Sequence, residues 1–330
     1  MSPAIKKTRK KTTKKVLSKV DVVLAADLGG TNLRCALISA RGRLISRVEV
    51  SSADGQSPAG MIALFGSAAR GLVADAGLQH MPRIGIGVAG GIDAARGIVT
   101  QSPQFPKWKN FALGPRLEEA LGTKVLLAND VDAALLGERW LGAAKGAQTV
   151  VAYWLGTGVG GALVLDGKLW NGPSGMAGEL GHMLVDPAGE RCNCGARGCL
   201  ETISSATGIE RAARKAARAG KPIKLDGKTA RTAREVFEAA VAGDAQARAI
   251  WKRAGWALGE SIGGLVNALS IDRVVIGGKV AGAGRFFLPE LRRAAKARAF
   301  RYPGSRLHLE LAELGDDAGL LGAASLALGK

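Results

Sequence analysis

Two short segments of this chain, 127 residues apart, share one pattern that limits the folds open to it. Residues 28–38 (LGGTNLRCALI) and 155–165 (LGTGVGGALVL) each predict the end of a strand, a glycine turn and a second strand. The apolar run at 22–26 supplies the strand before the first turn. Two similar halves indicate a duplication, so the sequence predicts an α/β fold with two domains around a cleft.

The glycine turns suit phosphate binding, because backbone N–H groups without neighbouring Cβ atoms can approach a polyphosphate closely. Thr31 and Thr157 each add a hydroxyl donor to such a turn. A glycine-rich hairpin can also exist only to turn a strand, so either turn alone is a weak indication. Their equivalent places in the two halves favour phosphate binding, although neither matches a Walker A loop or a Rossmann fingerprint.

The chain has 330 residues and a hydrophobic content of 47%, enough to bury two cores. Its apolar runs are short, and Asp21 and Asp27 bracket the run at 22–26. We therefore expect no membrane-spanning helix and no signal peptide. The expected compartment is the cytoplasm, where thiols suited to zinc stay reduced.

The net charge of +18 is unevenly distributed along the chain. Residues 1–20 carry eight lysines and arginines and no acidic residue, which leaves +10 for the rest. Low apolar content and self-repelling charge predict a disordered tail. The tail is either a solvated leader or a weak contact for a polyanion. Nucleic acid is not expected as a partner, since no aromatic residue lies among the lysines to stack on bases.

Three of the four cysteines follow a histidine within one short segment, and together they form a possible ligand set: His182, Cys192, Cys194 and Cys199. One imidazole and three thiolates are typical of structural zinc, and four ligands leave no open position for catalysis. A disulfide to Cys199 and inert free thiols are the alternatives.

Residues around the cysteines favour the metal. Gly195 and Gly198 suit tight turns around an ion, which often need positive φ. Glu179 and Glu201 lie at the two ends of the segment. A loop clamped by zinc would hold both carboxylates in fixed directions, so they could bind a ligand.

Between the two glycine turns, Ser57 and Pro58 predict the start of a helix that ends near residue 77. Apolar residues at 84–88 and 124–128 predict two further strands. Asn129 and Asp130 fall where the second of these ends and a helix begins. Asp130 is either a helix cap or a functional carboxylate at the carboxyl end of a strand, where open α/β sheets bind ligands.

Together these segments resemble the ROK family (repressors, open reading frames and sugar kinases), and most of all its bacterial glucokinases. ADLGGTNLR (26–34) and LGTGVGG (155–161) are similar to its two phosphate loops, and LAND (127–130) to its catalytic strand end. ELGH (179–182) and CNCGARGCLE (192–201) resemble its zinc segment. VVIGG (274–278) resembles its adenosine-side motif, and DDAGLLGAA (316–324) its closing helix. The resemblance covers nearly everything from residue 21 onward and implies the actin-like, hexokinase-type ATPase fold.

The resemblance also implies an activity, the transfer of a phosphoryl group from ATP to the 6-hydroxyl of a hexose, with glucose favoured. Asp130 would act as the catalytic base. The implied sugar-binding residues are Asn110, Asn129, Asp130, Glu179, His182 and Glu201. His182 would have two roles, one ring nitrogen on zinc and the other toward the sugar.

The implied nucleotide-binding residues lie in three glycine motifs. They are Asp27, Gly29, Gly30, Thr31, Asn32, Gly156, Thr157, Gly158, Gly277 and Gly278. Asp27 would hold Mg²⁺ with the phosphates of ATP. Lys279 stands where the family usually has a small residue, and it either contacts a phosphate or ribose or points to solvent.

Several alternatives to a glucokinase stay open. The sugar could be N-acetylglucosamine, N-acetylmannosamine, mannose or fructose, because the family largely shares its hydroxyl-binding residues. Inorganic polyphosphate could replace ATP, although the polyphosphate kinases of this superfamily generally lack the zinc segment. A sugar-sensing regulator is less expected, since only 20 residues precede the first strand and a winged helix needs several dozen.

We expect residues 21–130 to form a smaller α/β domain with the first phosphate loop. Residues 131–330 would form a larger domain with the second phosphate loop, the zinc segment and the closing helix. A helix near 250–269, with the pair Gly263 and Gly264, belongs to the core or to the interface of an expected homodimer.

Overall fold

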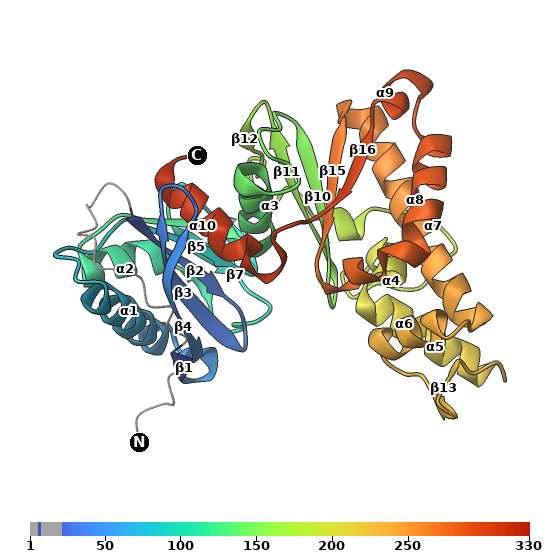
Figure 1. Ribbon diagram of the computed structural model, residues 1–330, viewed down its shortest axis with the longest axis horizontal. Coiled ribbons are helices and arrows are strands. Elements are labelled where there is room, and N and C mark those ends of the chain that lie inside the picture. The colour runs from blue at the N-terminus through green and yellow to red at the C-terminus, as the bar shows by residue number, and fades with distance from the viewer. Residues whose placement is uncertain (1–5, 8–21) are drawn as a thin grey trace. The chain divides into compact units, whose positions relative to one another are not determined.

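The computed structural model describes residues 6–7 and 22–330 and divides them into two compact units (Figure 1). The first unit contains the described residues up to Gly146 together with Asn171–Ala177 and Glu313–Lys330. The second contains Ala147–Trp170 and Gly178–Ala312. The predicted basic tail lies outside the described residues, apart from Lys6–Lys7.

The division of the chain differs from the one expected from the sequence. Residues 131–146 and the C-terminal helix, expected in the second domain, lie in the first unit. The physical reason is packing. The C-terminal helix buries its apolar residues against the first sheet, far from its neighbours in the sequence.

A six-stranded sheet forms the centre of the first unit. Its strands, in spatial order, are β1 (Lys6–Lys7), β4 (Leu44–Ser51), β3 (Asn32–Ser39), β2 (Val22–Leu28), β5 (Ile84–Val88) and β9 (Val125–Asn129). β2 pairs antiparallel with β3 and parallel with β5, which in turn pairs parallel with β9. The carboxyl ends of these three parallel strands therefore share one edge of the sheet, which is where Asp27 and Asn129 lie.

Helices cover both faces of this sheet, and the residues of β2 alternate between them as a strand requires. Val22 and Leu24 belong to the core that includes residues of α1 (Pro58–Asp75) and α2 (Leu113–Leu121). Val23 and Ala25 pack instead with α10 (Ala318–Leu328). The predicted start of α1 is confirmed: Ser57 is the N-cap and accepts a hydrogen bond from the backbone N–H of Gly60.

Small residues let α10 pack closely against both the sheet and α3 (Asp130–Leu141). A Cβ atom on Gly85 of β5 would overlap the carbonyl oxygen of Ala323. One on Gly322 would overlap the carbonyl oxygen of Ala133. The small-residue composition of segment 316–324 therefore has a packing reason within the first unit.

The remaining elements of the first unit are short. They are the 3₁₀ turns η1 (Ser52–Gly55) and η4 (Gly315–Asp317) and a small sheet of β6 (Gly91–Asp93), β7 (Ile98–Gln101) and β8 (Lys109–Phe111). β8 pairs antiparallel with β7 and carries Asn110, one of the predicted sugar ligands.

The second unit repeats the strand arrangement of the first. Its five-stranded sheet has the order β12 (Lys168–Leu169), β11 (Val159–Leu165), β10 (Val150–Leu155), β15 (Arg273–Gly277) and β16 (His308–Leu311). β10 and β11 form an antiparallel hairpin, and β10 pairs parallel with β15, as β2 does with β3 and β5. The duplication predicted from the two glycine turns is therefore present in the described sheets.

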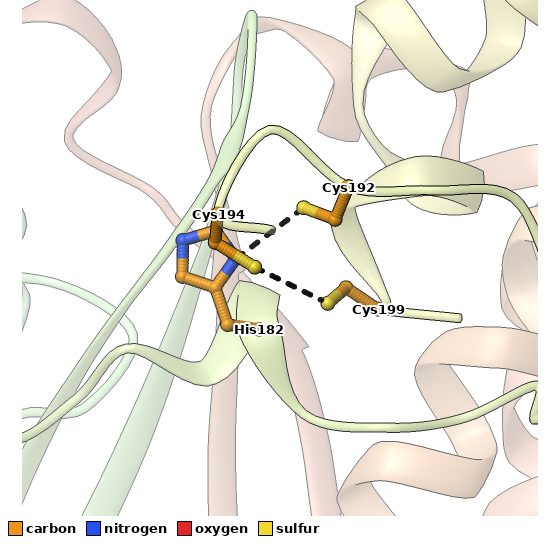
Figure 2. A group of neighbouring side chains, drawn as sticks. All are labelled: His182, Cys192, Cys194 and Cys199. Atoms are coloured by element: carbon orange, nitrogen blue, oxygen red, sulfur yellow. Dashed lines mark hydrogen bonds between the residues drawn. The ribbon is translucent and has the colours of Figure 1, made fainter. Parts of the chain in front are cut away.

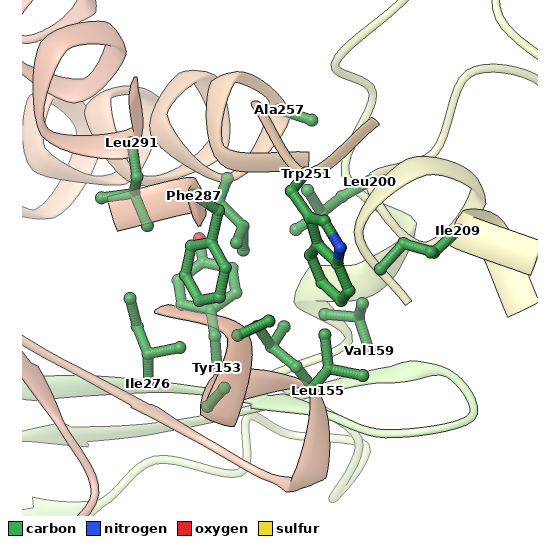
Figure 3. Close-up of a cluster of buried hydrophobic side chains, with 14 of the residues drawn as sticks. Tyr153, Leu155, Val159, Leu200, Ile209, Trp251, Ala257, Ile276, Phe287 and Leu291 are labelled. Carbon is green, nitrogen blue, oxygen red and sulfur yellow. The ribbon is translucent and has the colours of Figure 1, made fainter. Parts of the chain in front are cut away.

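Helices of the second unit pack on this sheet around large aromatic side chains. They are α4 (Glu201–Ser204), α5 (Ala206–Arg218), α6 (Ala233–Val241), α7 (Ala245–Leu269), α8 (Gly284–Arg298) and α9 (Arg301–Ser305). Figure 3 shows Tyr153 of β10 beside Phe287 of α8 and Trp251 of α7 in a shared core. Gly255 and Gly259 of α7 lie against the backbone of α8, where a Cβ atom would have no space.

The other elements of this unit are η2 (Leu180–His182), η3 (Lys279–Ala283) and the hairpin β13 (Lys224–Leu225) with β14 (Lys228–Thr229). None of the helices in the part of the chain that the structure describes is long and apolar enough to cross a membrane.

Candidate active site and metal centre

Asn129 begins α3 as its N-cap. Its Oδ1 accepts a hydrogen bond from the backbone N–H of Val131 at 2.8 Å, and its Nδ2 donates to the carbonyl oxygen of Gly90 at 3.0 Å. Asp130 is already the first residue of the helix. The cap is therefore Asn129, and the interpretation of Asp130 as a plain cap is wrong. Both polar groups of the Asn129 side chain hold the strand end in place.

Asp130 lies beside this cap with a partly buried side chain. Burial, together with the nearby charge of Asp27, raises the pKa of the Asp130 carboxyl to about 6. Hydrogen bonds from the backbone N–H of Val131 and from Asn129 oppose part of that rise. A carboxylate with a pKa close to neutral is a better proton acceptor than an ordinary one, yet it stays largely ionised at pH 7.

Asp27 lies at the same edge of the first sheet. Its Oδ2 pairs with the guanidinium of Arg34, whose Nη1 also donates to the carbonyl oxygen of Asp316 at 2.9 Å. Arg34 thus connects the end of β2 with the turn that precedes α10. A carboxylate held in this position has the oxygen chemistry that Mg²⁺ prefers.

The first glycine turn is fixed by bonds to its surroundings. The backbone N–H of Gly29 donates to the carbonyl oxygen of Asn32 at 3.0 Å, and that of Ser52 donates to the carbonyl oxygen of Thr31 at 2.9 Å. The side chain of Asn32 donates to Glu49 at 2.6 Å. These contacts leave Thr31 and Asn32 exposed on a turn of defined shape.

Gly30 of this turn lies against Gln104, a residue that no sequence pattern indicated. A Cβ atom on Gly30 would lie 3.0 Å from Oε1 of Gln104. Gly30 does not have a positive φ. Glycine at position 30 therefore leaves space for the side chain of Gln104. The backbone conformation there does not itself require glycine.

Asn110 is exposed, and its φ of 47° is in the left-handed region, which asparagine tolerates better than most residues. Aromatic rings on both sides hold this stretch. Phe105 and Trp108 stack with ring centroids 4.2 Å apart, and Trp108 lies 4.8 Å from Phe111. The predicted sugar ligand thus projects from a rigid segment.

The second glycine turn rests on the residues that follow the cysteines. Glu201 accepts a hydrogen bond from the backbone N–H of Val159 at 2.9 Å, and its carboxylate packs against Gly158. Thr207 donates through Oγ1 to the carbonyl oxygen of Thr157 at 2.9 Å. The backbone N–H of Ala206 donates to the carbonyl oxygen of Gly156, also at 2.9 Å.

The third glycine motif packs beside the second. Gly278 has φ +85°, and a Cβ atom there would overlap the backbone of Leu155, directly before the second turn. Gly277 lies against the ring of Trp154. Lys279 follows with an exposed side chain.

The predicted metal ligands converge on one point in the second unit (Figure 2). The ligand atoms of His182, Cys192, Cys194 and Cys199 all lie within 4.8 Å of one another. Nδ1 of His182 is 3.7 Å from Sγ of Cys192, and Sγ of Cys194 is 3.7 Å from Sγ of Cys199. A tetrahedron with Zn–S bonds of about 2.3 Å has edges of roughly 3.8 Å, so the donor set fits zinc.

The backbone around this cluster supports the same assignment. Gly195 and Gly198 have φ of +97° and +77°, which confirms the predicted positive values. The cysteines are free, so the disulfide alternative is not supported. A hydrogen bond from the backbone of Ala196 lowers the pKa of Cys194, whereas burial raises that of Cys199.

His182 directs its two ring nitrogens to different groups, as the predicted double role requires. Nδ1 faces Cys192, and Nε2 lies 3.9 Å from Oε2 of Glu179. Oε1 of Glu201 lies 3.9 Å from Sγ of Cys192. Three of the predicted sugar ligands, Glu179, His182 and Glu201, therefore surround the cysteine cluster.

The structure thus gathers the predicted residues into two groups. Asp27, Asn129, Asp130 and the first glycine turn lie at one sheet edge of the first unit, with Asn110 on its small sheet. The metal cluster, its carboxylates and the other glycine motifs lie together in the second unit.

Comparisons with known proteins identify the family of this chain. The ROK family model matches residues 23–330. Glucokinase from Thermotoga maritima is 36% identical over 314 residues, covering 92% of this chain and 96% of the relative. N-acetylmannosamine kinase from Shigella flexneri is 35% identical over 312 residues, covering 93% and 99%. A crystal structure of a ROK family glucokinase from Streptomyces griseus, in complex with glucose and AMPPNP, has a TM-score of 0.74 and 29% identity, covering 94% and 100%.

ROK sugar kinases have the actin-like, hexokinase-type fold, so the predicted fold class is confirmed. Because the family match spans nearly all of the described residues, this chain belongs to the ROK family.

Proposed function

We propose that this protein is an ATP-dependent hexose kinase that phosphorylates the 6-hydroxyl of glucose. The main support is Asp130, a partly buried carboxylate with a raised pKa at the carboxyl end of β9. Asn129 is the N-cap of α3, so Asp130 does not serve as the cap. The similarity to a glucokinase and to a glucokinase complex with AMPPNP supports the sugar and the nucleotide.

In the proposed reaction, Asp130 accepts the proton of the sugar hydroxyl as that oxygen bonds to phosphorus. Asn129 keeps the strand end fixed, so the carboxylate is positioned before the sugar arrives. Asn110, Glu179, His182 and Glu201 bind the other hydroxyl groups.

The nucleotide phosphates are bound by exposed backbone N–H groups and hydroxyls of the two glycine turns, with Gly277 and Gly278 on the adenosine side. Mg²⁺, when bound, neutralises phosphate charge, and Asp27 would hold it. Zinc would be structural, because His182 and the three cysteines occupy all four positions.

We further propose that the protein is a cytoplasmic homodimer. The four free cysteines include three that suit a reduced zinc site, which favours the cytoplasm. The helix expected near 250–269 is the candidate dimer interface, and as α7 it contributes most of its apolar residues to the core of its own unit. Light scattering of the purified protein decides the oligomeric state.

N-acetylmannosamine is the second candidate substrate, because a kinase for that sugar matches the chain at 35% identity with similar coverage. The deciding experiment measures ADP release with ATP across glucose, mannose, fructose, N-acetylglucosamine and N-acetylmannosamine. The highest kcat/KM is expected with glucose. A higher value with another hexose reassigns the substrate, and no turnover with any hexose favours a sugar-sensing regulator. Replacing ATP by polyphosphate in the same assay tests the phosphoryl donor.

A further inference from the structure

A cavity of the second unit lies next to the zinc segment and takes no part in the proposed phosphoryl transfer. Its volume is about 380 Å³, within the range of a small-molecule site. Four stretches line it: Asp186–Glu190 of the zinc segment, the Thr202–Ile203 part of α4, and one face each of α5 and α7. All of them belong to one compact unit.

Cations outnumber carboxylates in the lining of this cavity by three to two. Arg211 and Lys215, one turn apart on α5, share the face that lines it, and Arg253 of α7 joins them. Asp186 and Glu190 are the acidic residues of the lining. Arg253 pairs with Asp186 at 2.6 Å, and Lys215 pairs with Glu190 at 3.0 Å.

Glu190 lies near several cations. Arg211 lines the same cavity, and Arg197 donates to the carbonyl oxygen of the neighbouring Gly189 at 3.0 Å. The guanidinium of Arg211 makes a long contact of 3.5 Å to the carbonyl oxygen of Arg191 and lines the cavity. The Glu190 side chain is 52% exposed and that of Lys215 is 78% exposed, so this pair can open without unfolding the segment. An exposed ion pair of this kind is weak and exchangeable.

We propose that this cavity binds a small phosphorylated metabolite, whose phosphate group replaces the Glu190 carboxylate among Arg211, Lys215 and Arg197. A phosphate offers more acceptor oxygens and more negative charge than a carboxylate, and arginine binds it through paired N–H groups. The aliphatic side chains of Ala212, Ala249 and Ile250 provide the apolar part of the site.

The cavity is coupled to the zinc segment by short backbone bonds. The N–H groups of Val185 and Asp186 both donate to the carbonyl oxygen of Gly198, and the N–H of Gly198 donates to that of Glu190 at 2.9 Å. Thr202 of the lining donates to the carbonyl oxygen of Cys199 at 2.7 Å. A phosphate that displaces the Glu190 side chain would shift this backbone, and with it the metal ligands and Glu201, without unfolding the segment.

The regulatory part of this proposal rests on the proposed function. If Glu179, His182 and Glu201 bind the sugar, a phosphate in the cavity weakens sugar affinity. By linkage, sugar then weakens phosphate affinity by the same factor.

The test is isothermal titration of the zinc-loaded full chain with inorganic phosphate and, separately, with glycerol 3-phosphate, which distinguishes free phosphate from a phosphate ester. Arg211→Ala should weaken binding at least tenfold, and Glu190→Gln should tighten it at least threefold because the competing carboxylate is gone. Two matched controls should stay within twofold of the wild type. Arg214→Ala removes an arginine of the same helix that pairs with Glu210, and Glu238→Gln removes a paired surface carboxylate elsewhere.

Unchanged phosphate affinity in both Arg211→Ala and Glu190→Gln overturns the proposal, because the anion then binds elsewhere, for example at the glycine turns. Changes of the same size in phosphate affinity in the two controls also overturn it. They would show that affinity follows the net charge of the protein and not a particular site. Zinc content and melting temperature of each variant exclude misfolding as the cause. Saturating phosphate should weaken calorimetric glucose affinity at least threefold in the wild type and not in Arg211→Ala. If the wild type phosphorylates no hexose, only the regulatory part fails, and the phosphate titrations still decide the site.

Discussion

The carboxylate of Glu201 joins the metal centre to the second glycine turn through Val159. Oε2 accepts the backbone N–H of Val159 at 2.9 Å, while Oε1 lies 3.9 Å from Sγ of Cys192. A disturbance at the metal centre therefore affects the proposed sugar ligands. It also affects the second glycine turn, which we assign to the nucleotide phosphates.

Loss of zinc is expected to weaken both substrates. Cys194→Ser removes one of four ligands, so the purified variant should contain less than about a tenth of a zinc per chain, against near one in the wild type. Affinity for glucose and for AMPPNP should each fall at least about tenfold, because Glu201 loses its fixed direction. Metal analysis and calorimetry measure both effects.

Cys35→Ser is the matched control, since Cys35 is a buried free thiol of the first unit. It should keep its zinc. Full sugar and nucleotide affinity in zinc-free Cys194→Ser would contradict the proposed role of the metal.

Asp130→Asn should remove turnover and leave sugar binding nearly intact. The amide keeps the shape of the side chain but cannot accept the hydroxyl proton, so kcat should fall by about 10² to 10⁴-fold, and glucose affinity should change by less than about tenfold. Steady-state kinetics and calorimetry separate the two quantities. Near-normal turnover would direct the search for the base to Glu179 and Glu201.

Asn129→Ala is the informative comparison for that variant. It removes the N-cap of α3 and the bond to Gly90, so it should lower the free energy of unfolding by about 1 kcal/mol or more. A stable Asp130→Asn and a destabilised Asn129→Ala would together confirm that the cap belongs to Asn129.

The raised pKa of Asp130 gives stability and activity a defined pH dependence. The carboxyl binds its proton more tightly in the folded chain, with a pKa of about 6 against an ordinary 3.8. Its contribution to stability is present below the ordinary pKa and is lost as pH rises through the folded value. Asp130→Asn should therefore be more stable than the wild type at pH 8, by up to ~3 kcal/mol, and the gain should vanish near pH 4.

Urea unfolding at the two pH values measures that difference. In the wild type, kcat/KM should fall about tenfold per pH unit below about pH 6, because the base becomes protonated. A rate that stays flat down to pH 5 would exclude Asp130 as the titrating base.

Glu138 is expected to be the most important buried charge for the stability of the first unit. Its fully buried carboxylate accepts backbone N–H groups from Ala143 at 2.8 Å, Glu313 at 3.1 Å and Leu314 at 2.9 Å. Glu138→Ala leaves these donors without that acceptor and should cost at least about 2 kcal/mol in urea unfolding. Glu138→Gln should cost less, since the amide oxygen replaces one acceptor.

Glu119 of α2 provides the control, because its side chain is exposed. Glu119→Ala should change the free energy of unfolding by less than about 0.5 kcal/mol. Equal small effects at both positions would show that the bonds of Glu138 contribute little.

Features that depend on local pattern or on ligand chemistry could be predicted from the amino-acid sequence alone. The two glycine hairpins follow from alternating apolar runs and glycine pairs, and the metal centre from one histidine and three cysteines. The start of α1 follows from Ser57 and Pro58. Each is encoded within a few residues, so its physical cause is visible in the chain without knowledge of the fold.

The side chains that hold these parts together could be identified only from the folded chain. The assignment of the helix cap to Asn129 required the positions of Val131 and Gly90. Gln104 contacts Gly30, and Glu138 accepts bonds from Glu313 and Leu314, 175 and 176 positions later in the chain. Both contacts join residues that are far apart in the sequence, so they depend on the path of the folded chain. The bonds of Glu138 form because the segment before α10 returns to the first unit, where α10 is buried on the sheet. Burial is a property of the assembled core, and a side chain's own sequence neighbours do not specify its partners.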